Sequence, residues 1–200
     1  MKQILLFVCL GLSAFAQSNP AISLIDHMQK KYKGMGSFAA NFSYQSDGGG
    51  PMTGSITVKG TKFRLKTAGQ EIFNNGKEVA TYIKEINEVN ISAFDPSDGD
   101  LNPAKIYTFD KKSYKFKLVS ENAGIATVEM APGNKSTQVK QITLKINSAD
   151  FTVKEWTIVT KSGKKQVFKV TKLNTKAGVD DAFFTFSKKA FPGVEVNDLR

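Results

Sequence analysis

Apolar residues spaced three or four positions apart mark the start of the folded part of the chain. This spacing is the stripe of an amphipathic helix of about four turns, and its members are Ile22, Ile25, Met28, Tyr32 and Met35. Gly34 and Gly36 follow and predict the end of the helix.

The period then changes to two, because apolar and polar residues alternate from Phe38 to Tyr44 as in a strand with one buried face. Further strand-like runs lie at Ser55–Lys59, Lys62–Thr67, Gln70–Asn74, Glu78–Lys84, Glu88–Phe94, Tyr114–Ser120, Ile125–Ala131, Val139–Asn147, Thr152–Thr160, Lys165–Leu173 and Phe183–Ser187. Short turns separate most of them, and parallel crossovers need longer connections. The pattern predicts a mainly β protein of about 11 antiparallel strands in a barrel or strongly curved sheet.

The two series of strands are separated by a segment rich in Asp, Gly and Pro. Asn102 is a good N-cap and Pro103 suits the first helical position, so a short helix is expected after them. Its apolar residues are Ile106, Tyr107 and Phe109. Two helices with apolar faces are compatible with a lid over the sheet, although periodicity alone favours ordinary core packing.

The first sixteen residues have the pattern of a cleaved export signal. Lys2 precedes an apolar run that ends at the small-residue motif Ala14-Phe15-Ala16. We therefore expect a signal peptide over residues 1–16 and a single exported domain over residues 17–200. Cys9 is the only cysteine and lies inside this signal, so the mature chain would have neither disulfides nor a catalytic thiol.

Charge is distributed unevenly. The chain has 28 basic and 18 acidic residues, and residues 111–172 alone hold 13 basic and 4 acidic side chains. Strand alternation places Lys115, Lys117 and Lys145 opposite apolar neighbours, on an outer face that suits anionic lipid headgroups or an acidic protein surface. An export signal and the absence of an RNA-binding pattern of exposed aromatics argue against nucleic acid.

Motifs of catalysis and metal binding are missing. His27 is the only histidine, and no nucleophile elbow, phosphate loop or HExxH motif occurs. Asp98, Asp100 and Asn102 have the first spacings of a calcium loop, but Pro103 and Phe109 stand where that loop requires Gly and Glu. We predict no enzyme activity, no metal site and no cofactor.

Several short motifs, in order along the mature chain, resemble the LolA family of periplasmic lipoprotein carriers. These motifs are Phe38-Ala39-Ala40-Asn41-Phe42, Gly54-Ser55-Ile56-Thr57-Val58-Lys59-Gly60, Lys62-Phe63-Arg64-Leu65, the Asn75-Gly76-Lys77 turn, Asn102-Pro103-Ala104 and Pro192-Gly193-Val194-Glu195-Val196.

The resemblance implies an incomplete, half-open antiparallel β-barrel whose open side is covered by the N-terminal helix and a short mid-chain helix. It also implies a monomer that holds the acyl chains of lipoproteins in an apolar cavity. The candidate cavity residues are Phe42, Phe63, Leu65, Tyr82, Ile106, Tyr107 and Phe109. Implied partners are acylated lipoproteins, an inner-membrane lipoprotein-releasing ABC transporter and an outer-membrane acceptor similar to LolB. A lipid- or lipoprotein-sensing envelope regulator on the same fold is the alternative, since fold alone does not determine function.

One position departs from the family pattern. In the family, an arginine after the Val-Lys strand end latches the barrel to the lid helices, but Gly60 and Thr61 stand at that place here. Lys62 and Arg64 are the candidate substitutes, although alternation places both opposite Phe63 and Leu65.

Overall fold

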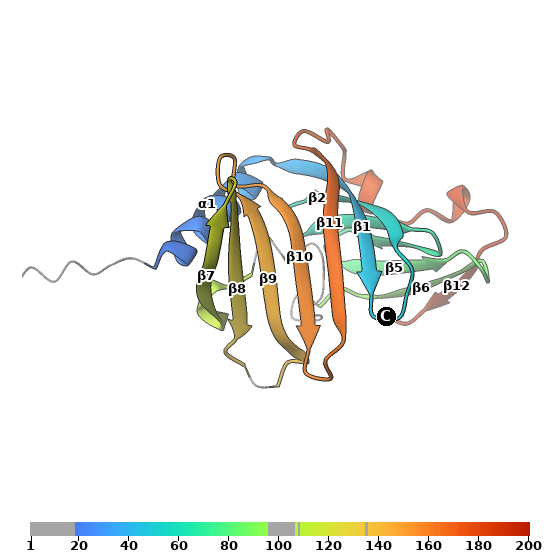
Figure 1. Cartoon of the computed structure of the whole chain (residues 1–200). Helices are drawn as coiled ribbons and strands as arrows, with labels where there is room; N and C mark the ends of the chain where they lie inside the picture. The colour runs from blue at the N-terminus through green and yellow to red at the C-terminus, as the bar shows by residue number, and fades with distance from the viewer. Residues whose placement is uncertain (1–18, 96–106, 108, 135) are drawn as a thin grey trace, which may run out of the picture.

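One large sheet dominates the computed structural model, which describes residues 19–95, 107, 109–134 and 136–200 (Figure 1). The elements in chain order are α1 (Pro20–Gly34), β1 (Ser37–Ser46), β2 (Met52–Lys59), β3 (Lys62–Thr67), β4 (Gln70–Asn74), β5 (Glu78–Ile83), β6 (Glu88–Ala93), the 3₁₀ helix η2 (Lys111–Ser113), β7 (Tyr114–Asn122), β8 (Ile125–Pro132), β9 (Val139–Asn147), β10 (Val153–Thr160), β11 (Lys165–Asn174), the 3₁₀ helices η3 (Ala182–Phe184) and η4 (Lys188–Ala190), and β12 (Glu195–Asp198).

The strand order is β12-β6-β5-β4-β3-β2-β1-β11-β10-β9-β8-β7. Neighbours pair antiparallel except for β12, which runs parallel to β6. The edge strands β7 and β12 do not pair with each other, so the barrel is incomplete. The predicted fold class, a mainly β half-open barrel, is therefore confirmed.

The prediction of a strand over Phe183–Ser187 is wrong. This segment begins in η3, where the Asp180 carboxylate accepts a hydrogen bond from the Phe183 backbone N–H at 3.0 Å. Phe184 is fully buried, so burial in a tight turn had imitated the alternation of a strand. The last strand is β12 instead, a four-residue strand that is too short to show a period.

The N-terminal helix forms as the sequence predicts. The Asn19 side chain caps it by accepting from the Ala21 N–H, and Pro20 occupies its first turn. Its buried residues are Ala21, Ile25, Met28 and Tyr32. Two residues of the predicted stripe lie elsewhere: Ile22 is exposed, and Met35 follows the helix as its C-cap.

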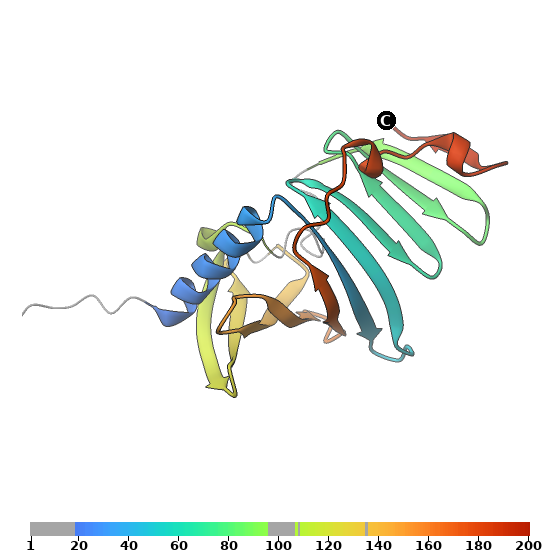
Figure 2. The ribbon, with the colours of Figure 1, turned by 90° about the horizontal axis from the view of Figure 1, so that it is seen from above.

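The two faces of the sheet are buried against different partners. The inner face carries Phe42, Ile56 and Phe63 and shares the main hydrophobic core with α1. Seen from above, the strands form two walls, and α1 lies along the wall that contains β7 (Figure 2). Among the described residues, α1 therefore contacts β7 more than it contacts the wall formed by β1 to β6.

The outer face of β4 to β6 is covered by the C-terminal part of the chain. Phe73, Ala80 and Val89 are buried there with Val194, and Phe186 and Phe191 pack against them. The Phe73 ring makes edge contacts with the Phe186 and Phe191 rings at centroid distances of 5.8 and 6.0 Å.

Within the residues that the structure describes, no helix is long and apolar enough to cross a membrane. The predicted short helix after Asn102 falls outside those residues, as does Ile106.

A buried tyrosine pair joins α1 to the strands. The Tyr32 hydroxyl oxygen accepts from the Val153 backbone N–H at 3.0 Å, and the Tyr107 ring stacks on the Tyr32 ring at a centroid distance of 3.9 Å. Burial raises the pKa of Tyr32 to about 12 and raises the pKa of Tyr107 well above its usual value.

We expect this pair to make the fold sensitive to alkaline pH. Because the folded pKa of Tyr32 lies above the unfolded value of 10.0, its stabilising contribution is complete below pH 10 and is lost as pH rises toward about 12. Urea unfolding at pH 9 and pH 11 should show a smaller loss of stability with pH in Tyr32→Phe than in the wild type. Equal losses in the two proteins would contradict the assignment.

Candidate functional site

Three of the predicted cavity residues lie together on the inner face. Phe42, Phe63 and Leu65 project from β1 and β3, and the strand register places Leu65 between Ile56 of β2 and Ile72 of β4. Phe42, Ile56 and Phe63 are buried, whereas Leu65 and Ile72 are half-buried. We call this row the inner wall; its residues are Phe42, Ile56, Phe63, Leu65 and Ile72.

An aromatic series continues the inner wall onto β10 and β11. The Trp156 ring stacks on the Phe168 ring at 4.8 Å, and Phe168 lies 6.2 Å from Phe42 and 4.7 Å from Tyr44. Trp156 is buried, while Tyr44 and Phe168 are half-buried. The inner wall therefore adjoins a second apolar surface that is also not fully covered.

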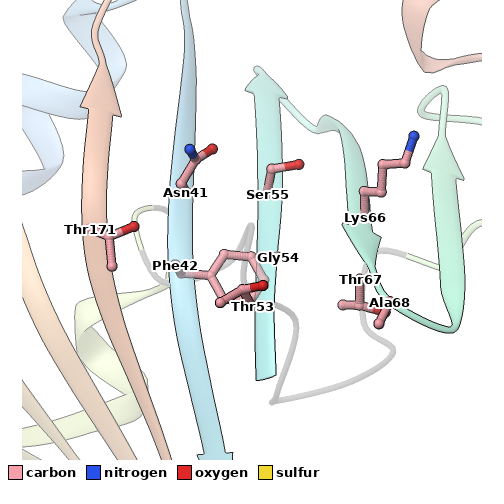
Figure 3. A pocket seen from close by; sticks show the side chains of 9 residues that line it. All are labelled: Asn41, Phe42, Thr53, Gly54, Ser55, Lys66, Thr67, Ala68 and Thr171. Carbon is pink, nitrogen blue, oxygen red and sulfur yellow. The ribbon is translucent and has the colours of Figure 1, made fainter. Parts of the chain in front are cut away.

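A glycine in β2 makes room for the Phe42 ring. Figure 3 shows this ring reaching from β1 across β2 at Gly54. A Cβ atom at position 54 would lie 2.5 Å from Phe42 Cζ and 2.7 Å from the Lys66 carbonyl oxygen. Since the carbonyl belongs to the backbone of the neighbouring strand, only a residue without a side chain fits.

Gly54→Ala should destabilise the protein by about 1–3 kcal/mol, because the added methyl group forces Phe42 off its position or separates β2 from β3. Gly50→Ala is the matched control, since a Cβ there meets no atom within 4 Å. Denaturant unfolding of both variants measures the difference, and equal stabilities would contradict the close approach.

Tyr107 and Phe109 lie in a different part of the core. Tyr107 is buried between Tyr32 of α1 and Phe38 of β1, with ring centroids 3.9 and 5.0 Å away. Phe109 packs edge-on against Tyr114 of β7 at 5.5 Å, and its carbonyl accepts from the Gln29 side chain of α1. These two residues hold α1 to the strands and do not line the inner wall.

Tyr82 is not brought together with the other candidates. It pairs with Glu71 across β4 and β5, so its side chain shares the outer face with Phe73 rather than the face of Leu65. Its ring contacts Phe191 at 4.5 Å and its hydroxyl donates to Asn87. The expectation that Tyr82 lines the cavity overlooked the β4–β5 register, which a sequence alone does not provide.

Sequence reasoning missed one polar residue of the inner face. Asn74 is fully buried, pairs with Phe63 across β3 and β4, and accepts a hydrogen bond from the Gly76 N–H at 2.7 Å. Its side-chain nitrogen Nδ2 has no hydrogen-bond partner among the described residues. A buried donor without a partner is costly, so this amide group destabilises the empty protein.

The candidate latch residues contact the C-terminal segment. Lys62 forms an ion pair with Asp181 at 2.6 Å, and the Arg64 guanidinium lies over the Phe73 and Phe183 rings. Both side chains lie on the outer face, as alternation predicts. In the part of the chain that is described, neither reaches α1, which instead binds Lys111 through Asp26.

The three lysines of the predicted docking face differ in their pairing. Lys145 forms an ion pair with Glu155 at 2.8 Å. Lys115 and Lys117 are exposed on β7, with their side chains on the opposite face from the core residues Tyr114, Phe116 and Leu118. Lys115 and Lys117 are thus the more accessible charges of this group.

The described residues contain no group of three or more His, Cys, Asp or Glu side chains that could hold a metal ion. The calcium-like spacing at Asp98, Asp100 and Asn102 falls outside those residues. His27 is exposed on α1, where its ring stacks on Phe151 at 4.8 Å and its Nδ1 lies 2.8 Å from the Ser23 carbonyl.

The chain matches a known protein family. The family model described as outer membrane lipoprotein carrier protein LolA matches residues 12–164. By sequence alone, the chain matches no protein of curated function.

Three solved structures illustrate the fold. A conserved protein of Thermus thermophilus aligns with a TM-score of 0.60 at 12% identity, covering 90% of this chain and 99% of its own. A domain assigned to outer membrane lipoprotein sorting from Vibrio parahaemolyticus aligns with a TM-score of 0.53 at 9% identity, covering 86% and 98%. MucB aligns with a TM-score of 0.50 at 17% identity, covering 84% of this chain and 63% of MucB.

Proposed function

Because the chain belongs to the outer membrane lipoprotein carrier protein LolA family, we propose that it binds the acyl chains of lipoproteins against its inner wall and carries them between two membranes. The observation that carries this proposal is the half-buried state of Leu65 and Ile72, which adjoin the buried Ile56 on the inner face.

The physical requirement is that acyl chains leave water. Transfer of a chain from water to an apolar surface is favourable by about 0.8 kcal/mol for each methylene group. The inner wall and the neighbouring Tyr44 and Phe168 supply apolar surface that the protein itself does not fully cover. A carrier needs this property, since a wall that is packed solid by its own side chains has no room for cargo.

Asn74 adds a polar group beneath this surface, and because it is fully buried, a ligand would reach it only if the neighbouring side chains move. Its unpartnered Nδ2 lies beside Phe63 on the inner face. An acylated lipoprotein bears ester or amide carbonyls at the head of its chains, and one of these would satisfy the donor. Binding would then recover the cost that the empty protein bears for this amide.

A carrier of this kind works in the periplasm with an inner-membrane ABC transporter as donor and a LolB-like protein as acceptor. We assign the docking of the donor to Lys115 and Lys117, which are exposed on β7. Reversing both charges, Lys115→Glu with Lys117→Glu, should slow cargo pick-up from the transporter by about tenfold and leave acyl binding unchanged. Pick-up at the wild-type rate would show that the two lysines serve solubility alone.

The proposed function is tested by purifying the mature protein from a periplasm and examining it by native mass spectrometry. We expect a fraction with a lipoprotein bound, and we expect the empty protein to release lipoproteins from spheroplasts. Protein that carries no acylated species and releases none is not a carrier. Stable capture of one signalling partner without net transfer would identify the regulator alternative.

A further inference from the structure

An open pocket lies where β11, β1, β2 and β3 run side by side (Figure 3). Its volume is about 470 Å³, and its lining residues are Asn41, Phe42, Thr53, Gly54, Ser55, Lys66, Thr67, Ala68 and Thr171. The polar residues of this lining belong neither to the inner wall nor to the other residues assigned to cargo binding.

The polar members share one face of the sheet. Asn41 pairs with Ser55, and Ser55 pairs with Lys66, so the three side chains form a row across β1, β2 and β3. Thr171 lies at the register shift of β11, between the partners of Asn41 and Phe42. Asn41, Lys66 and Thr171 are exposed, so an amide, an ammonium and a hydroxyl group face solvent beside the apolar lining.

Positive charge around the pocket exceeds what the nearby carboxylates neutralise. Glu71 forms an ion pair with Arg64 at 2.6 Å and a longer one with Lys66 at 3.6 Å. One carboxylate therefore faces two cations. Glu155 likewise forms ion pairs with Lys145 at 2.8 Å and with Lys169 at 3.8 Å.

Lys172 adds a further cation, since it pairs in register with Asn41 and is exposed. Within the described residues, it has no carboxylate at ion-pairing distance. Lys66 and Lys169 each share a carboxylate with a second cation, and Lys172 lies on the same face, so positive charge exceeds negative charge near the pocket.

We propose that this pocket seats the phosphate of an anionic phospholipid headgroup and so docks the outer face of the sheet on an anionic bilayer. A phosphate diester takes one close cation together with several N–H or O–H donors. Lys66 supplies the cation, and Asn41, Ser55 and Thr171 supply the donors.

A bilayer fits the position of the pocket. The C-terminal segment contacts the outer face at Lys62 and Arg64 and covers Phe73, Ala80 and Val89. Asn41, Lys66 and Thr171 stay exposed, so this side of the pocket is open to a bilayer. Exposed lysines near an anionic leaflet are attracted to its surface potential within a Debye length. The polar row of the pocket lies on the face opposite the inner wall, and Phe42 is common to the pocket lining and the inner wall. The variants below change no residue of the inner wall, so they test the pocket separately from cargo binding.

The test is co-sedimentation of the full-length mature protein with vesicles. We expect binding to vesicles of equal parts phosphatidylglycerol and phosphatidylcholine, little binding to phosphatidylcholine alone, and release at high salt. Lys66→Gln combined with Lys172→Gln should weaken binding by about tenfold or more. Lys30→Gln combined with Lys33→Gln on α1 removes the same charge and should have little effect, since both lysines are exposed away from the pocket.

Three outcomes would overturn the proposal. The first is no preference for phosphatidylglycerol vesicles. The second is binding of inorganic phosphate, or of an acidic protein, without binding of vesicles. The third is an equal loss when Lys115 and Lys117 are changed to Gln, because this would assign the attraction to the whole basic face. Ser55→Ala separates the pocket from bulk charge, since it alters binding only if the hydroxyl contacts the headgroup.

Discussion

Arg64→Ala should lower the free energy of unfolding by about 3 kcal/mol. The Glu71 side chain is only 8% exposed, and its Oε1 accepts from Arg64 Nε at 2.6 Å. Removing one partner of a buried ion pair leaves the other charge poorly compensated, which costs about 3–5 kcal/mol. Lys66 stays 3.6 Å from the other carboxylate oxygen, so the lower end of that range applies.

The arginine also fixes the C-terminal segment. Its guanidinium lies 4.5 Å from the centre of the Phe73 ring and 4.7 Å from the centre of the Phe183 ring. Loss of this stacking weakens the attachment of η3 to the sheet, which then depends on Phe184 and on the Lys62–Asp181 ion pair. Proteolysis of Arg64→Ala under native conditions should therefore begin near residues 180–190.

Two controls separate these effects. Lys66→Ala removes the exposed partner of the same carboxylate and should cost less than about 1 kcal/mol. The double variant Arg64→Met with Glu71→Met removes both charges and should recover most of the stability lost in Arg64→Ala. Denaturant midpoints for the three variants provide the comparison, and a double variant as unstable as the single one would contradict the ion-pair account.

Leu65→Asp should abolish acyl binding, with an affinity loss of at least about 100-fold. Losing the leucine surface costs about 1.5–3 kcal/mol, and desolvation of the carboxylate beneath an acyl chain adds to this cost. Because Leu65 is half-buried, the new carboxylate keeps access to water in the empty protein, and the fold is expected to survive.

The matched control for this substitution is Val167→Asp. Val167 is also half-buried in a strand, but it pairs with Thr157 on the outer face. Titration with a diacylated lipopeptide should show binding by Val167→Asp and no binding by Leu65→Asp. Equal affinities would place the acyl chains away from the inner wall.

Much of the fold could be predicted because strand alternation is a local property. The runs at Lys62–Thr67, Gln70–Asn74 and Val139–Asn147 have the bounds that the sequence indicates. The segment at Phe183–Ser187 could not be predicted correctly, since aromatic residues buried against a distant strand imitate the same alternation.

The candidate site was predicted less completely. Phe63 and Leu65 could be assigned to one face because they are two residues apart in the same strand. The face of the sheet on which Tyr82 lies depends on the pairing of β4 with β5. The lack of a partner for Asn74 Nδ2 depends on its burial. These are properties of tertiary structure, and no local pattern reports them.

Trp156 offers the most direct test of the claim that acyl chains lie on the inner face, since it is the single tryptophan and is buried there against Phe168. The measurement is quenching of its fluorescence by a diacylated lipopeptide with brominated acyl chains. We expect saturable quenching in the wild type and none in Leu65→Asp. Binding of the lipopeptide without quenching of Trp156 would contradict the account.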